Sequence, residues 1–289
     1  MTTLENDHLR ISVRPKGAEL TSIFHKPTAI EHLWQADPTV WGWHAPNLFP
    51  VVGGCLNNQL LVNGKTYPIE RHGFARQSIF DTTESSASHA VFSLRSTDVT
   101  RVHFPFEFEF QIIYELNGSS LNITYRVVNE DDQVVFFSVG AHPAFAVPFY
   151  AGEDYEDYFI EFEKTEPLET HMLSGSGYFT GETHPIFTDG NRLPLTKHLF
   201  DQDALVFKTL ESRRATIRSK KNKHTVIVDY PDFPYLGIWA KPKAPFVCIE
   251  PWLGCADSEG RQKPIQEKEA IQQVAQDHVF KATFTITIS

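Results

Sequence analysis

The segment that decides the fold is Phe106-Glu107-Phe108-Glu109-Phe110-Gln111-Ile112-Ile113-Tyr114-Glu115-Leu116. Apolar side chains occupy every second position of it, with polar ones at most positions between them. A period of two is typical of a strand with one face in the core. Shorter segments of the same kind occur along the chain, at Leu9–Val13, Ala90–Leu94, Leu121–Val127, Val134–Val139, Tyr158–Phe162, His224–Val228, Leu236–Trp239, Phe246–Ile249 and Ala282–Ile288. The sequence therefore predicts an all-β protein.

The connections between these segments indicate how the strands pair. Gly, Pro, Asn and Asp turns separate them, and a helical period is present only in Pro264–Gln276. Strands without intervening helices favour antiparallel sheets packed face to face. We expect a large antiparallel β-sandwich, with residues 1–289 as a single domain. The glycine- and proline-rich segment Pro167–Leu199 is predicted to be a long surface excursion that can wall a binding cleft.

Charge and hydropathy exclude several classes of partner. The net charge is -10, and the basic residues form no block longer than Lys220-Lys221 with nearby Lys223. We therefore expect no nucleic-acid partner. The segment Met1–His8 has neither a basic start nor an apolar run, and no segment approaches the ~18 apolar residues that span a bilayer. These features predict a cytoplasmic protein with no membrane partner.

The cysteines and the common catalytic motifs add further limits. Cys55, Cys248 and Cys255 cannot all pair within the chain, so we expect reduced thiols with a structural role. The sequence contains no GxSxG, P-loop, HExxH or CxxC motif.

Two histidines stand at positions that suit acid–base chemistry. His72 lies between Arg71 and Arg76, and is either a neutral hydrogen-bond donor or acid facing a polar ligand or a locally satisfied ring. His142 ends the apolar run Val134–Ala141 and precedes a proline. A ring at such a strand end is partly desolvated, which shifts its pKa.

A carboxylate occupies a comparable position downstream. Glu250 ends the run Phe246–Ile249 and precedes Pro251-Trp252. Desolvation beside tryptophan would raise its pKa and make it a better base at neutral pH, whereas the alternative is a surface glutamate at a strand exit. The aromatic residues that could stack on a sugar face, or else belong to the core, are Trp41, Trp43, Phe145 and Trp252. Two histidines with a glutamate could also hold zinc or iron, although we predict no metal.

Taken in order, a set of short motifs resembles the aldose 1-epimerase (galactose mutarotase) superfamily, and most closely its LacX-like branch. The motifs cover nearly the whole chain: Gly17-Ala-Glu-Leu20, Pro46-Asn-Leu-Phe-Pro50, Gly64-Lys-Thr-Tyr67, His72-Gly-Phe-Ala-Arg76, Phe104-Pro-Phe106, Gly140-Ala-His-Pro143, Asp203-Ala-Leu205 and Ile249-Glu-Pro-Trp252. The resemblance implies a sandwich of the galactose mutarotase type, also called a supersandwich. It also implies an isomerase with an open cleft for a hexose and no cofactor.

The resemblance further implies residue roles. Glu250 would be the base that removes the C1 hydroxyl proton, and His142 the acid at the ring oxygen. His72 would hydrogen-bond the same region and share the acid role. Asp203 would hold sugar hydroxyls, with Asp201 as an alternative, and Arg76 would position the ligand or Glu250.

Two other functions remain open on the same residues. Arg71 and Arg76 could bind the phosphate of a phosphorylated hexose, because a guanidinium group suits that anion. The fold could instead carry a non-catalytic carbohydrate-binding or sensing protein, because a fold alone does not define a function. The sequence gives no prediction of oligomeric state.

Overall fold

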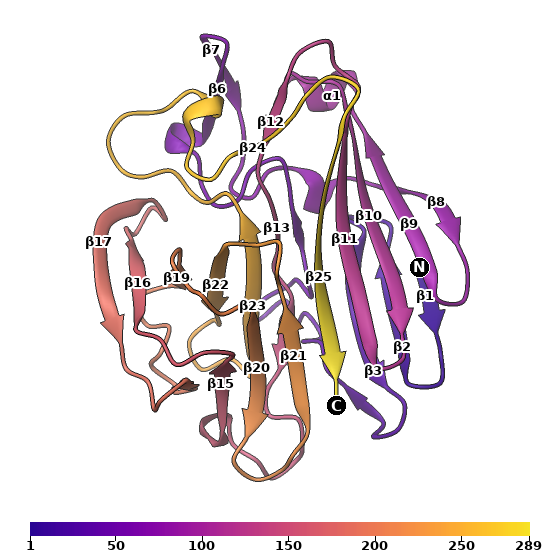
Figure 1. Cartoon of the computed structure of the whole chain (residues 1–289), viewed down its shortest axis with the longest axis vertical. Helices are drawn as coiled ribbons and strands as arrows, with labels where there is room; N and C mark the ends of the chain where they lie inside the picture. The colour runs from indigo at the N-terminus through magenta and orange to yellow at the C-terminus, as the bar shows by residue number, and fades with distance from the viewer.

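The structure is a computed structural model that describes residues 1–289, and nearly all of its regular structure is β-sheet (Figure 1). The largest sheet has nine strands, ordered β18 (Arg192–Pro194), β15 (Tyr158–Phe162), β20 (Arg214–Ser219), β21 (Thr225–Asp229), β25 (Val279–Ile288), β11 (Ser120–Asn129), β10 (Phe108–Asn117), β9 (His89–Arg95) and β8 (Asp81–Ser85). All of its neighbouring strands are antiparallel. The predicted antiparallel sheet structure is confirmed.

A six-stranded sheet carries the functional region. Its order is β19 (Leu205–Phe207), β22 (Tyr235–Trp239), β23 (Phe246–Leu253), β13 (Val139–Ala141) and β5 (Asn47–Leu48), and β14 (Ala144–Ala146) also pairs with β23. The N-terminal sheet contains β1 (Thr2–Glu5), β2 (Leu9–Arg14), β3 (Glu19–His25) and β4 (Ile30–Glu31). Three two-stranded sheets pair β6 (Gln59–Val62) with β7 (Lys65–Pro68), β12 (Val135–Phe137) with β24 (Gln272–Val274), and β16 (Leu168–Leu173) with β17 (Phe179–Ile186).

Strands β10 and β11 of the nine-stranded sheet pack through the core against the six-stranded sheet. Phe110 on β10 stacks on Phe49 with ring centroids 4.3 Å apart, and both rings are fully buried. The Tyr125 hydroxyl on β11 donates to Asn47 Oδ1 over 2.7 Å, which satisfies a polar pair inside the apolar layer. This packing fixes β5 and β13 beneath the nine-stranded sheet.

Two predicted segments differ from the structure. Pro167–Leu199 does lie at the surface, but it forms the β16–β17 hairpin and β18. Most of β17 is exposed, so the apolar alternation that identifies other strands is missing. Pro264–Gln276 forms a 3₁₀ turn at Ile265–Glu267 and strand β24 in place of a helix, because β24 pairs with β12.

Regular helices are short throughout the structure. The one α-helix, α1 (Asp98–Arg101), has four residues, so no helix is long enough to cross a bilayer. The three cysteines are buried and unpaired, in agreement with the expectation of free thiols.

Candidate active site

A cleft of about 260 Å³ opens on one face of the six-stranded sheet. This volume lies just below the range of about 300–1,000 Å³ usual for small-molecule sites. Glu250 and Trp252 lie two residues apart on β23, so both side chains point to the same face, and both line the cleft. The other predicted site residues that line it are Arg71, His72, Arg76, His142 and Asp203.

Two glycines on neighbouring strands make room for the Trp252 ring. Gly237 on β22 is in register with Glu250, and Gly140 on β13 is in register with Trp252. A Cβ added at Gly237 would lie 2.6 Å from Trp252 Cζ2, and one added at Gly140 would lie 2.7 Å from Trp252 Cδ1. The indole therefore lies flat against the backbone of both strands and forms part of the floor of the cleft.

The substitution Gly237→Ala is expected to destabilise the fold and to weaken ligand binding together. The added methyl group would push against a ring that is only 7% exposed, and such overpacking costs about 1–3 kcal/mol. Thermal unfolding and sugar titration would measure both effects. Gly175→Ala is the matched control, because its Cβ would meet no atom within 4 Å. An unchanged melting temperature in Gly237→Ala would contradict the proposed packing.

An acid–base pair lies at the centre of the cleft. Glu250 Oε2 is 3.3 Å from His142 Nε2. Burial raises the pKa of Glu250 well above its usual value, the nearby Trp252 indole offsets part of the rise, and Asp203 adds to it. Neither Glu250 Oε2 nor Trp252 Nε1 has a hydrogen-bond partner, so both are free to contact a ligand.

His142 is held by the backbone and by two aromatic rings. It follows β13, and its backbone N–H donates to the Pro46 carbonyl over 3.1 Å. Trp41 stacks on its ring at 5.0 Å between centroids, and Trp239 packs edge-on at 5.8 Å. Burial among these groups lowers the pKa of His142 to about 3.

The two pKa shifts have opposite signs and the same effect on charge. Both shifts favour uncharged forms, namely a protonated Glu250 and a neutral His142. Moving that proton from Glu250 to His142 gives a carboxylate and an imidazolium with the same total charge. Both arrangements carry one proton on the pair, and the raised pKa of Glu250 and the lowered pKa of His142 favour the uncharged one.

His72 enters the cleft from a strained backbone position. Its φ is +67°, in the left-handed region, and its backbone N–H donates to the Gly53 carbonyl over 2.9 Å. The Gly53 N–H in turn donates to His72 Nδ1 over 3.1 Å, which leaves the ring proton on Nε2. Burial lowers the pKa of His72 well below its usual value, with His142 and the flanking arginines adding to the effect. His72 is thus a neutral N–H donor beside His142.

The two arginines form one wall of the cleft. Arg71 Nη2 donates to the Ser176 carbonyl over 2.7 Å, in the turn of the β16–β17 hairpin. Arg76 Nη2 donates to the Arg71 carbonyl over 2.9 Å, and its guanidinium lies over the Trp43 ring at 5.4 Å. Trp43 therefore supports Arg76 and does not line the cleft itself.

The two candidate aspartates lie in different surroundings. Asp203 lines the cleft with φ +106°, and its Oδ1 accepts the Ala204 N–H over 2.8 Å. Asp201 pairs with His198 over 2.8 Å and faces a neighbouring hollow. Of the two, Asp203 is positioned to meet a ligand in this cleft.

Phe145 corrects one expectation about the site. It was predicted to contact the sugar, but its ring is fully buried in the core and does not line the cleft. On β14 it is in register with Val247 of β23, one strand residue out of phase with the cleft-facing side chains. Trp239 lines the cleft instead. It was not predicted from the sequence, although it lies two residues from Gly237 on the same face of β22.

Other residues of the cleft come from segments without a clear sequence signal. Leu173 and Phe179 belong to the β16–β17 hairpin, and Val206 belongs to β19. The hairpin has too little alternation to be recognised from sequence, so its contribution to the cleft follows only from the structure.

The side chains close enough to bind one metal ion in the cleft differ from the two histidines and a glutamate suggested by the sequence. His142, Cys248 and Glu250 lie close enough for one atom of each to be within 4.8 Å of the others, whereas His72 is outside this group. Burial raises the pKa of the Cys248 thiol well above its usual value. A thiol must be deprotonated to bind a metal, so these residues fit one poorly.

The fold and cleft define a class: an antiparallel β-sandwich with a coupled carboxyl–imidazole pair in an aromatic, cationic cleft. A sequence model of the aldose 1-epimerase family matches residues 1–272. The chain is 33% identical to the LacX protein of Lactococcus lactis subsp. lactis, covering 99% of this chain and 98% of that protein. The chain therefore belongs to the aldose 1-epimerase family.

Solved structures support the same assignment. A galactose mutarotase related enzyme from Lactobacillus acidophilus has a TM-score of 0.93 and 33% identity, covering 99% of this chain and 96% of that chain. A galactose mutarotase-like protein from Lactobacillus casei has a TM-score of 0.94 and 32% identity, covering 100% of both chains. The predicted galactose mutarotase-type sandwich and the resemblance to the LacX branch are confirmed.

Proposed function

We propose that the protein is a cofactor-independent aldose 1-epimerase that interconverts the α and β anomers of a hexose. The observation that carries this proposal is the Glu250–His142 pair, with 3.3 Å between Oε2 and Nε2, on the wall of the cleft. Ring opening of an aldose needs one base and one acid beside the same carbon. The pair supplies both from a single shared proton.

The reaction begins when the Glu250 carboxylate takes the proton of the C1 hydroxyl. The C1–O1 bond gains double-bond character, the bond from C1 to the ring oxygen breaks, and the His142 imidazolium protonates that oxygen. Rotation about C1–C2 exposes the other face of the aldehyde, and the reverse steps close the ring. The pair returns to its starting state, so protons and electrons balance without a cofactor.

The surrounding residues have supporting roles in this proposal. His72 donates its Nε2–H as a neutral group to an oxygen near the reacting carbon, because its Nδ1 already accepts the Gly53 N–H. Asp203 accepts from sugar hydroxyls, and the Trp252 Nε1–H, which has no partner, donates to the sugar or to Glu250. Arg71 and Arg76, which also line the cleft, position the ligand.

Polarimetry of freshly dissolved α-glucose and α-galactose tests the proposal. The protein is expected to speed the approach to the equilibrium rotation well beyond the spontaneous rate. Saturable sugar binding in calorimetry without any acceleration would instead identify a carbohydrate-binding or sensing protein. No acceleration across a panel of free hexoses would reject the proposed activity.

The value of kcat/KM is expected not to rise as pH increases through the ordinary pKa of histidine. Activity needs one proton on the pair, which gains a second only as pH falls through the His142 pKa of about 3. At the other end, activity is lost as pH rises through the raised pKa of Glu250, where the pair loses its proton. Polarimetric rates between about pH 5 and 7, corrected for the spontaneous reaction, should show no rise with pH near 6.5. A rise there would mean that deprotonation of an ordinary imidazole controls the reaction, whereas a fall would report the raised pKa of Glu250.

A phosphorylated hexose is a second candidate substrate. It is favoured by the two guanidinium groups of Arg71 and Arg76 in the cleft, since arginine binds phosphate through paired N–H groups. Competition calorimetry distinguishes the two substrates. Tighter binding of hexose 6-phosphate than of the free sugar, lost in Arg71→Ala, would select the phosphorylated substrate.

A further inference from the structure

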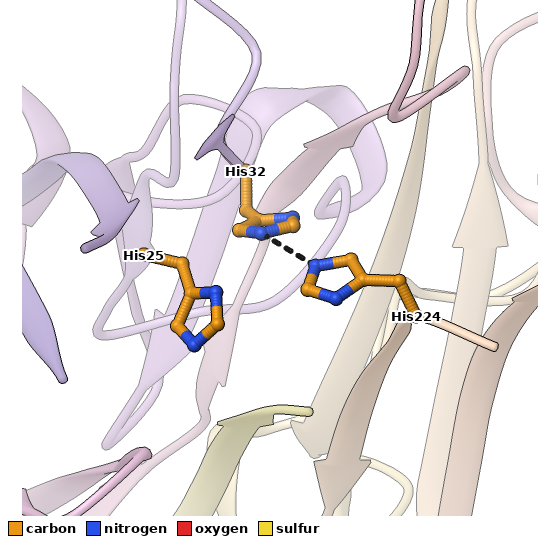
Figure 2. A group of neighbouring side chains, drawn as sticks. All are labelled: His25, His32 and His224. Carbon is orange, nitrogen blue, oxygen red and sulfur yellow. Dashed lines mark hydrogen bonds between the residues drawn. The ribbon is translucent and has the colours of Figure 1, made fainter. Parts of the chain in front are cut away.

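A second group of ionisable side chains lies outside the cleft. It consists of His25 at the end of β3, His32 just after β4, and His224 just before β21 (Figure 2). One ring nitrogen of each lies within 4.8 Å of those of the other two. None of the three lines the sugar-sized cleft, and the proposed reaction uses none of them.

The spacing of the rings is close to that of a metal site. His32 Nε2 and His224 Nε2 are 3.0 Å apart, and Figure 2 shows these two nitrogens directed at each other. Two imidazole nitrogens bound at 2.0–2.1 Å to one tetrahedral ion are about 3.3 Å apart. A small outward shift of these two rings, with His25 moving inward, would therefore place an ion between them.

Burial makes the cluster costly without a ligand. His25, His32 and His224 are 7%, 0% and 9% exposed, and His32 Nδ1 has no hydrogen-bond partner. Burial favours uncharged rings, which is the form in which histidine binds a metal.

The surroundings of the cluster suit a bound ion. Phe149 packs its ring edge-on against His32 and His224, at 5.3 and 5.6 Å between centroids, which limits water on that side. Thr28 Oγ1 lies 2.7 Å from His25 Nδ1 and can orient that ring. The loops at 26–29 and 221–223, next to the cluster in sequence, are mostly exposed, so the cluster adjoins surface segments.

We propose that His25, His32 and His224 bind one divalent transition-metal ion, with zinc as the ion that three imidazoles suit best. The ligands come from two different sheets, because β3 and β4 belong to the N-terminal sheet and β21 to the nine-stranded sheet. The ion therefore fastens these two sheets together and acts on stability, not on the sugar chemistry.

Calorimetric titration of chelator-treated protein with ZnCl₂ tests the site. We expect one equivalent to bind, and the melting temperature to rise by about 5–10 °C at 100-fold the dissociation constant. His224→Gln and His25→Gln should each bind zinc about 100-fold more weakly, since each removes one ligand. His198→Gln is the matched control, because His198 is an exposed histidine paired with Asp201 and should not contribute.

X-ray absorption of the zinc-loaded wild type does not depend on any variant folding. The spectrum should show three imidazole ligands and no sulfur. Zinc binding should also persist in Glu250→Gln. Sulfur ligation, or loss of binding in Glu250→Gln, would place the ion beside Cys248 in the cleft and overturn the proposal. Loss of binding in His198→Gln, or no saturable binding by wild type, would overturn it as well.

Discussion

The substitution Glu250→Gln is expected to lower kcat for anomer interconversion by about 10³-fold while the protein stays folded. Glutamine has nearly the same shape but cannot take the C1 hydroxyl proton, so the base is lost from the pair. Burial raises the pKa of Glu250 and so favours the uncharged side chain in the ligand-free protein. A neutral amide should therefore cost little stability.

Polarimetry at saturating sugar and thermal unfolding of the same preparation would separate the two effects. Glu115→Gln on the exposed face of β10 is the matched control and should leave both unchanged. A Glu250→Gln variant that keeps more than about a tenth of wild-type activity would show that another group acts as the base.

The substitution His142→Ala is expected to lower kcat by about 10²- to 10³-fold. It removes the group that protonates the ring oxygen and leaves space beneath Trp41, which stacks on the imidazole at 5.0 Å. Added imidazole should fill this space and restore part of the activity. Such rescue distinguishes a lost acid from a collapsed cleft.

The control for this variant is His198→Ala at an exposed position, which should behave like wild type with or without imidazole. Sugar affinity measured by calorimetry should change much less than kcat, because the proposed role of His142 is in the reaction and not in binding. A loss confined to affinity would assign His142 to substrate binding.

Local sequence patterns predicted much of the fold. Strand β10 is recognisable because one of its faces is buried along its whole length, which imposes strict alternation. Strand β17 escaped recognition because only its first residue is buried. The segment Pro264–Gln276 shows helical spacing, yet β24 forms there because β12, far away in the chain, offers it a pairing edge.

Two residues that line the cleft could be picked out because each is a polar residue at the end of an apolar strand. His142 and Glu250 each end such a run, and folding places them 3.3 Å apart. Successive side chains of a strand point to opposite faces, and the sequence does not show which face forms the cleft. Phe145 was therefore predicted to contact the sugar although it faces the core. Trp239 could be placed only once its partner strand β23 was known.

The cleft combines a floor and a rim of different origin. Its floor lies on central strands, where Trp252 is fitted against Gly140 and Gly237 and tolerates no added atoms. Part of its rim comes from the β16–β17 hairpin, whose turn holds Arg71 through Ser176 and whose outer strand is largely exposed. Mutational tolerance should follow this division. Directed evolution of a new ligand specificity should therefore begin at the hairpin while the floor is kept constant.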